Sequence, residues 1–425
     1  MDPGTLLARI TDYASRPDPY PLYAELRAAG PVVRQDDGGF LVGGYHQIAA
    51  LLHDPRMSAD ERSRTAPAPY EGTRDASFLR LDDPEHHRLR TLAMRPFGPP
   101  HSPHRVDAMR GEIARITEEL LADLPADRPV DIVDDFAYPL PVIVICRLLG
   151  VPREDEPRFR AWSDALVATA DIRPGEDTTE VERAGDRAGA ELREYLLDLA
   201  ERRRGRPADD MLSAFVNEPD PSLRLSPQEL AVTAALLLIA GHETTVNLIT
   251  NGVLTLLRGP EHLERLRREP GLLPRAVEEL LRYEPPVHLR ERVPLVDIEV
   301  AGTTIPAGTS VMLALASGNR DPLRFPEPDR FVPDRPDNEH LGFGSGIHLC
   351  YGAPLARIEA QTALGALLPR LEGAQLAEDP PYRRNAMLRG PRHLRVRLLT
   401  GAAPTTRDGA RGRRSGPGSP PWTGR

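Results

Sequence analysis

The sequence contains no lysine, so all 54 of its basic residues, in a chain of 425, are arginine. Arginine stays charged at any physiological pH and binds carboxylates through paired hydrogen bonds. An anionic cofactor or partner would therefore meet guanidinium groups rather than ammonium groups. The 63 acidic residues give a formal net charge of −9, which is no general reason to expect nucleic-acid binding.

Cysteine is equally scarce, with Cys146 and Cys350 as the two in the chain. Two cysteines are too few for a disulfide framework or, by themselves, for a structural zinc site, which favours a reducing cytoplasmic setting. No basic segment followed by an apolar stretch opens the chain, so we predict no signal peptide. The longest apolar runs, near 231–241 and 139–146, are shorter than the roughly 20 residues that span a bilayer. We expect no membrane partner.

Apolar residues make up 40% of the chain, enough to bury a large core. The clearest predicted element is a helix that begins after Ser226, a good N-cap, with Pro227 at its first position and Glu229 completing a capping box. The pattern continues to Gly259, over about 32 residues or roughly 48 Å. Its apolar stretch LAVTAALLLIA predicts burial on all sides at the centre of a helical domain.

The rest of the chain divides into a helical part and a smaller strand-forming part. Residues 105–125 and 185–204 have helical spacing with charged faces. After residue 290, VDIEVAGTTIPAGTSVMLAL indicates short strands joined by Gly and Pro turns. Residues 401–425 are rich in Gly, Pro, Ser and Arg and have little to bury, so we predict a disordered tail.

Polar residues interrupt the predicted central helix. Gly241, His242, Glu243, Thr244 and Thr245 follow one another in an otherwise apolar pattern. Glu243 can be a buried acid that a neighbouring arginine neutralises, with the Thr244 hydroxyl bonded back to the preceding turn. Considered alone, the helix favours this structural interpretation over a functional one. We interpret His242 and Thr245 as structural.

The second informative stretch is HLGFGSGIHLCYGAPLARIEA, residues 340–360. Gly342, Gly344 and Gly346 alternate ahead of Cys350, and the pattern then becomes helical. Such a loop can approach an atom closely and turn backbone N–H groups toward it. A cysteine among these groups at a helix N-terminus favours the thiolate, and therefore metal ligation. An inert buried cysteine would leave the glycines unexplained, and zinc would need ligands that the neighbouring sequence does not offer.

This loop resembles the haem-binding loop of the cytochrome P450 family, Phe-Gly-x-Gly-x-His/Arg-x-Cys-x-Gly. The fixed places are matched by Phe343, Gly344, Gly346, His348, Cys350 and Gly352. Two further patterns stand in the family's order: AGHETT at 240–245 resembles the oxygen-activation motif, and EELLRY contains Glu279-x-x-Arg282. We therefore expect one haem domain over residues 1–400, followed by the tail.

The resemblance implies a fold that is mainly α with a smaller β part: a triangular helical domain, a long central helix across the haem, and a small β-sheet region. It implies haem b as cofactor, with Cys350 as the axial ligand whose thiolate promotes O–O cleavage. Phe343 would shield the sulfur, and Gly344 and Gly352 would also contact the cofactor. Tyr351 departs from the family pattern, because many relatives carry a smaller aliphatic residue there.

Further site residues are implied by the same resemblance. Glu243 and Thr244 would be the catalytic acid and alcohol that deliver protons to bound oxygen. Ala240 and Gly241 would border the haem, although glycine costs about 1 kcal/mol relative to alanine in a helix. The cations expected at the haem propionates are His86 and Arg90, four residues apart on one helical face, and Arg292 and His348 on the other side.

A structural network and a substrate pocket complete the predicted site. Glu279, Arg282 and Arg330 would form a buried salt-bridge network behind the haem loop. The pocket would include Val287, His288, Leu289 and Met387. We predict either that His288 bonds a polar substrate or that it is satisfied by the backbone.

The implied activity is a monooxygenase that hydroxylates or epoxidises a small organic substrate with O2, tailoring a secondary metabolite. NAD(P)H would supply electrons through ferredoxin reductase and ferredoxin, and the substrate would arrive free or bound to a carrier protein. Alternatives are a P450-type enzyme with another outcome, such as aryl coupling, nitration or peroxide-driven oxidation, and a non-catalytic helper protein. Such helpers lack the ligating cysteine, which Cys350 supplies here.

Overall fold

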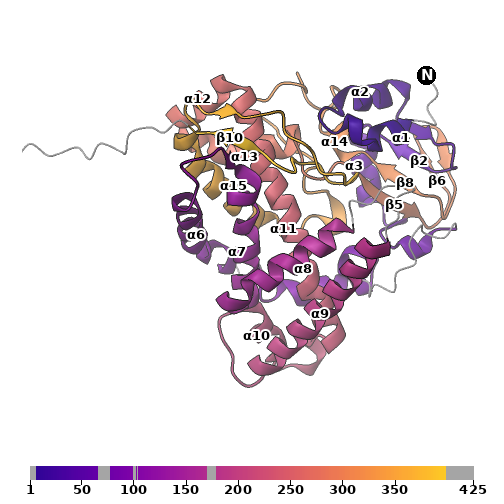
Figure 1. Ribbon diagram of the computed structural model, residues 1–425. Coiled ribbons are helices and arrows are strands. Elements are labelled where there is room, and N and C mark those ends of the chain that lie inside the picture. The colour runs from indigo at the N-terminus through magenta and orange to yellow at the C-terminus, as the bar shows by residue number, and fades with distance from the viewer. Residues whose placement is uncertain (1–5, 66–76, 99–101, 103, 170–178, 399–425) are drawn as a thin grey trace, which may run out of the picture.

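The computed structural model describes residues 6–65, 77–98, 102, 104–169 and 179–398. Figure 1 shows a roughly triangular molecule, with helices on the left and below and small sheets with α1–α3 at the upper right. The long helix α11 crosses its middle. The prediction of a mainly α fold with a smaller β part is confirmed. The predicted tail over 401–425 lies outside the described residues.

The helices follow one another along most of the chain. Their bounds are α1 Leu6–Thr11, α2 Tyr20–Ala29, α3 Tyr45–His53, α4 Glu85–Met94, α5 Arg105–Ala108, α6 Arg110–Ala122, α7 Pro139–Leu149, α8 Glu156–Ala168, α9 Thr179–Arg203, α10 Met211–Val216, α11 Pro227–Arg258, α12 Pro260–Arg268, α13 Leu273–Tyr283, α14 Leu315–Gly318 and α15 Ala353–Leu367. The two segments with predicted helical spacing correspond to α5–α6 and to α9.

The central helix has the predicted start and end. The Ser226 side chain accepts from the backbone N–H of Glu229, whose carboxylate accepts from the N–H of Ser226, so the capping box is present. On length and composition alone α11 could cross a membrane, but 61% of its most apolar window is buried in this fold. It packs against α7, α9 and α15, as a core helix does.

The strands form three small sheets. Their bounds are β1 Val32–Arg34, β2 Phe40–Val42, β3 Met57–Ser58, β4 Val130–Asp131, β5 Arg290–Pro294, β6 Ile298–Val300, β7 Thr303–Ile305, β8 Val311–Leu313, β9 Gln375–Leu376 and β10 Arg395–Arg397. The largest sheet has the order β1-β2-β8-β5-β3, with β2 and β8 parallel. The sequence predicted the short strands after residue 290, and this sheet places the N-terminal strands β1 and β2 beside them.

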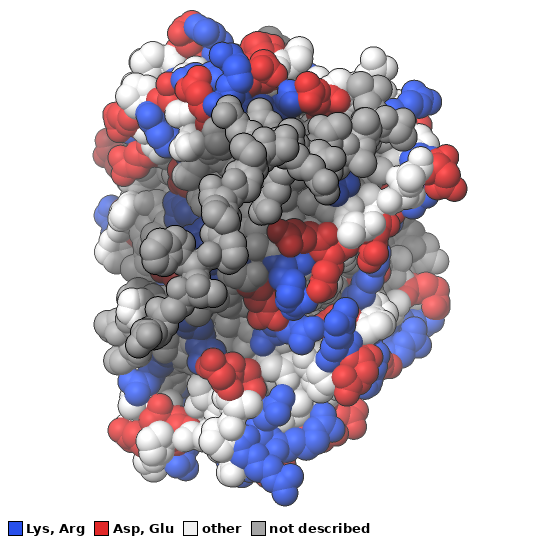
Figure 2. Space-filling model, turned by 90° about the vertical axis from the view of Figure 1, so that its left-hand side faces the viewer, with Lys and Arg blue, Asp and Glu red and all other residues white. Residues whose placement is uncertain are grey.

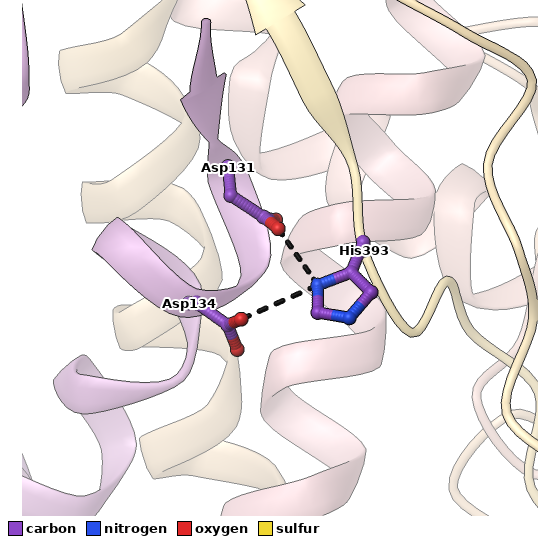
Figure 3. A group of neighbouring side chains, drawn as sticks. All are labelled: Asp131, Asp134 and His393. Carbon is purple, nitrogen blue, oxygen red and sulfur yellow. Dashed lines mark hydrogen bonds and ion pairs between the residues drawn. The ribbon is translucent and has the colours of Figure 1, made fainter. Parts of the chain in front are cut away.

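An acid–histidine cluster fastens the sheet β4-β10-β9. Figure 3 shows His393 between Asp131 and Asp134, with its Nδ1 at 2.8 Å from Asp131 Oδ2 and 3.3 Å from Asp134 Oδ2. The other oxygen of Asp131 accepts from the backbone N–H groups of Val133 and Leu394. Both oxygens of Asp131 are therefore used in joining β4 to the segment before β10.

The predicted salt-bridge network is present, but one of its three members is wrong. Glu279 and Arg282 are fully buried and form two hydrogen bonds of 2.8 Å. The second arginine is Arg335, whose Nε lies 3.0 Å from Glu279 Oε1. Arg330 contributes only its carbonyl oxygen to Arg282 and Arg335, and its side chain pairs with Glu327 at the surface.

We predict that Arg335→Ala lowers the free energy of unfolding by about 3 to 5 kcal/mol, because it leaves a buried carboxylate with one cation fewer. Arg330→Ala is the matched control and changes it by about 0.5 kcal/mol or less, since that side chain is exposed. Urea denaturation of both variants checks this. Equal losses, or a larger loss at Arg330, would contradict the assignment.

Candidate active site

The glycine-rich loop before α15 has a shape that depends on its glycines. Gly344 and Gly346 both have φ of +69°, a left-handed conformation that other residues adopt only under strain. A Cβ on Gly346 would lie 2.1 Å from the carbonyl oxygen of Leu52 in α3, and one on Gly342 would lie 2.5 Å from that of Leu281 in α13. The loop is therefore pressed against the ends of two helices, which fixes the position of Cys350.

Cys350 lies in the loop three residues before the first residue of α15 and is half-buried. Its backbone N–H donates to the carbonyl of Phe343 at 2.9 Å, which folds the loop back on itself. Burial raises the pKa of the Cys350 thiol, while the N–H groups of Gly352 and Ala353 and the charge of Arg90 act in the opposite direction. A bound metal cation would complete this stabilisation of the thiolate.

Phe343 is held by a contact that the sequence did not suggest. The Arg357 guanidinium lies 4.6 Å from the Phe343 ring centre and binds Glu278 through two hydrogen bonds of 2.7 and 2.8 Å. Burial opposes ionisation of Glu278, but hydrogen bonds from Arg357 and His340 lower its pKa to about 2. The signal in the sequence that could have pointed to this contact was that Glu278 directly precedes the motif residue Glu279.

Tyr351, the departure from the family pattern, fastens the loop to α4. Its hydroxyl donates to the carbonyl of Ala93 at 2.7 Å, and its ring stacks on Phe97 with centres 4.5 Å apart. Tyr351 and Leu236 of α11 pack against one apolar cluster that also contains Leu89. Three segments that the sequence marked separately therefore meet in one place.

Basic side chains gather beside the loop. The rings of His86 and His348 lie 4.3 Å apart, and His86 Nδ1 is 3.1 Å from Asp83. Arg90 donates to the carbonyl of Leu349 at 2.6 Å. Burial, and after it the positive charges nearby, lower the pKa of His348 to about 3.

Arg292 adds a buried cation to this group. Its side chain, 4% exposed, donates to the carbonyl of Glu291. Burial and the adjacent Arg290 lower the pKa of Arg292 to about 10. Over the described part of the chain no carboxylate lies within ion-pair distance of Arg292.

These residues fit an anionic cofactor. Both ring nitrogens of His348 and Nε2 of His86 are buried without a hydrogen-bond partner among the residues that the structure describes. A buried donor without an acceptor destabilises a fold, and so does a buried arginine without an acid. Carboxylates of a bound group at this position would satisfy both.

The middle of α11 shows an accessible face. Ala240 is exposed, and Gly241 and Thr244 are half-buried, whereas His242, Glu243 and Thr245 are buried. A Cβ on Gly241 would meet no atom within 4 Å. The Thr244 hydroxyl donates to the carbonyl of Ala240 at 2.8 Å, as the structural interpretation predicted.

Glu243 points away from that face. It is 3% exposed, and its Oε1 lies 3.1 Å from Nε of Arg383, a residue of the C-terminal part of the chain. The sequence predicted an arginine beside this acid but not which one. His242 is fully buried and bonded to Ser163 at 2.7 Å, in agreement with a structural role. The roles of Glu243 and Thr244 in proton delivery stay predictions.

Two of the predicted pocket residues are buried. His288 is fully buried, with its Nδ1 3.0 Å from the Tyr23 hydroxyl, a side-chain partner that the sequence did not predict, and a contact of His288 with substrate stays a prediction. Leu289, 1% exposed, belongs to an apolar cluster with Tyr23. Val287 is half-buried and Met387 is 37% exposed, and both remain candidates.

Figure 2 shows arginine and carboxylate side chains interspersed over the side that lies on the left of Figure 1. Helix α6, on that side, carries such pairs: Arg115 binds Glu119 at 2.5 Å and lies 3.5 Å from Glu112. Although the net charge of the chain is −9, positive and negative side chains therefore alternate on this face.

Comparisons with known proteins agree with this geometry. The family model described as cytochrome P450 matches residues 39–396. The chain is 42% identical to cytochrome P450 monooxygenase PikC of Streptomyces venezuelae over 94% of its length and 95% of the relative's. It is 40% identical to 6-deoxyerythronolide B hydroxylase of Saccharopolyspora erythraea, covering 90% of this chain and 96% of that one. The crystal structure of P450BioI in complex with an acyl carrier protein ligated to hexadec-9Z-enoic acid superposes with a TM-score of 0.81 at 36% identity, covering 91% and 99%.

We predict that Gly346→Ala lowers the haem-to-protein ratio of the purified chain, because an alanine at this φ costs about 1 to 3 kcal/mol and its Cβ overlaps the α3 backbone. Gly111→Ala, in α6 and away from this loop, is the control, since a Cβ there meets nothing within 4 Å and its φ is not positive. Haem content is measured by absorbance after extraction. Full haem content in Gly346→Ala would show that the loop does not need this glycine.

Proposed function

Because the chain belongs to the cytochrome P450 monooxygenase family, we propose that it inserts one oxygen atom from O2 into a C–H bond, or across a double bond, of a secondary metabolite. The observation that carries this proposal is Cys350 just before α15, beside buried nitrogens of His86 and His348 that have no hydrogen-bond partner and beside Arg292, which has no acidic partner, among the residues that the structure describes. When bound, haem ligated by a thiolate supplies the redox chemistry that activates oxygen.

Different residues of this chain would hold different parts of the cofactor. Cys350 would supply the thiolate ligand, and the loop glycines would bring it into position. Arg292 and His348 would hold one propionate, and His86 and Arg90 would hold the other. This arrangement would turn the unsatisfied buried donors of His86 and His348 into charge-assisted hydrogen bonds, which are stronger than neutral ones.

Thr244 and Glu243 supply protons in this proposal. Thr244 lies on the accessible face of α11, and its hydroxyl oxygen can accept a hydrogen bond while it donates to Ala240. Glu243 lies one residue earlier on the buried side, paired with Arg383. The carboxylate therefore has to turn, or act through water, to hand a proton to the face that Thr244 occupies.

The substrate is proposed to bind beside the exposed face of α11. Val287 and Leu388 are joined by an antiparallel bridge, which places Met387 at the turn beside it. A relative that hydroxylates 6-deoxyerythronolide B supports a macrolide-type substrate by its name. P450BioI was crystallised with an acylated carrier protein, which makes a carrier-tethered substrate the form to test against a free one.

Electrons are proposed to reach the cofactor from NAD(P)H through ferredoxin reductase and ferredoxin, in the cytoplasm. The loop around Cys350 exposes Ile347 and Leu349, which are 50% and 47% accessible, beside Arg90. A surface that combines apolar contacts with arginine suits docking of a small acidic protein.

The substrate class is tested by a spectroscopic panel. Purified protein is titrated with 6-deoxyerythronolide B, other macrolactones, terpenes and cyclic peptides, each free and, where a thioester can be made, on a carrier protein. A compound that shifts the haem Soret band is then incubated with 18O2 and the redox partners. One 18O atom in the product supports the proposal, whereas a coupled or nitrated product without 18O would replace it.

We predict that Thr244→Ala keeps haem and substrate binding but lowers product formed per NADPH by on the order of tenfold, with the lost electrons recovered as peroxide. Thr255→Ala is the matched control, because Thr255 makes the same back-bond on α11, to Asn251 at 2.8 Å, away from the predicted motif. Coupling is measured as product and peroxide per NADPH. Unchanged coupling in Thr244→Ala would remove Thr244 from the proton path.

A further inference from the structure

Three buried polar residues form a stripe along the central helix. Glu243, Asn247 and Asn251 stand four residues apart, and therefore on one face of α11, and all three are at most 3% exposed. Polar groups are found in such an environment only where partners compensate the loss of water. Asn251 donates to the carbonyl of Glu284 at the end of α13, at 3.2 Å, and the contacts that all three residues share come from one segment near the C-terminal end of the described chain.

That segment is a hairpin over residues 381–392. Its two arms are joined by hydrogen bonds from the N–H of Arg383 to the carbonyl of Gly390, at 3.1 Å, and from the N–H of Arg392 to that of Pro381, at 2.7 Å. At its turn, the Asn385 side-chain oxygen accepts from the backbone N–H groups of Met387 and Leu388. The hairpin is thus a defined unit rather than an irregular loop.

Each residue of the stripe contacts the hairpin. Glu243 Oε1 lies 3.1 Å from Arg383 Nε. Asn247 packs against Gly390 so closely that a Cβ there would lie 2.1 Å from Asn247 Oδ1. The amide of Asn251 donates to the carbonyl just before Gly390, at 3.1 Å. The far end of the hairpin carries Met387, so one element joins the candidate pocket to the predicted acid.

Among the hairpin residues that contact the stripe, Arg383 is the one whose charge acts directly on the carboxylate of Glu243. A guanidinium at this distance favours the ionised form of a carboxylate. His242, next along the helix, stays neutral, because burial, followed by the charges of Arg383 and Arg160 of α8, lowers its pKa to about 3. The amide of Asn247 lies 3.5 Å from Glu243 Oε1, which adds a weak neutral contact.

We propose that Arg383 is a positioning residue that holds Glu243 ionised and turned toward the hairpin, so that the position of the hairpin sets when this acid can take up a proton. The importance of this pair for the reaction rests on the proposed function. The effect of Arg383 on the charge of Glu243 is independent of that function, because it can be measured without substrate or redox partner.

The test is an infrared pH titration of the full haem-loaded chain, in which Glu243→Gln identifies the carboxyl signal of Glu243. Removing the guanidinium removes the group that favours the carboxylate, so in Arg383→Gln the protonated signal appears at a pH higher by about 1 to 3 units than in the unaltered protein. Arg383→Lys restores most of the difference. Arg384→Gln, an exposed neighbour on the same hairpin, is the matched control and leaves the titration unchanged.

An unchanged titration in Arg383→Gln would overturn the proposal. If that variant does not fold, Gly390→Ala replaces it, because its Cβ displaces Asn247 and the hairpin while keeping every charge. An upward shift there supports the proposal, and no shift overturns it. The pH profile of coupling, where a substrate is known, should move in the same direction in Arg383→Gln and return in Arg383→Lys, which a merely structural contact would not produce.

Discussion

Buried positive charge without matching negative charge is the constraint on which this site depends. Arg292 is 4% exposed and has no carboxylate in ion-pair contact, and the neighbouring His348 has two unsatisfied ring nitrogens, among the residues that the structure describes. Burying such groups alone is costly, so the fold is most stable with an anionic group between them. Because binding to the folded state alone stabilises it, loading of the cofactor and stability of the domain are linked.

The same principle of paired buried charge organises the regions around the site. Behind the loop, Glu279 forms ion pairs with Arg282 and Arg335. Glu278 pairs with Arg357 beside Phe343, and Glu243 pairs with Arg383 beside the central helix. Except for Glu279 and Arg282, which both belong to α13, each pair joins two segments distant in the sequence. A chain without lysine makes all of these contacts with guanidinium groups, which keep their charge when buried more readily than ammonium groups do.

Local signals in the sequence were sufficient for the elements and the loop. Ser226 and Glu229 mark the helix start through short-range hydrogen bonds, and the glycines before Cys350 mark backbone conformations that other residues avoid. Partners between distant segments were not predictable in this way. Arg335 rather than Arg330 reaches Glu279, His288 turns to Tyr23, and Arg383 reaches Glu243, because these depend on how hairpins and helix ends meet in three dimensions. The sequence does not encode them in any fixed spacing.

The most direct test of the account is the carbon monoxide difference spectrum of the reduced, purified protein beside its Cys350→Ser variant. A haem iron with a thiolate ligand gives a Soret band at much longer wavelength than one with a neutral ligand. We expect this band in the unaltered protein and its loss in Cys350→Ser. Absence of the band from freshly prepared, haem-supplemented protein, or its persistence in Cys350→Ser, would contradict the assignment of Cys350 as the ligand.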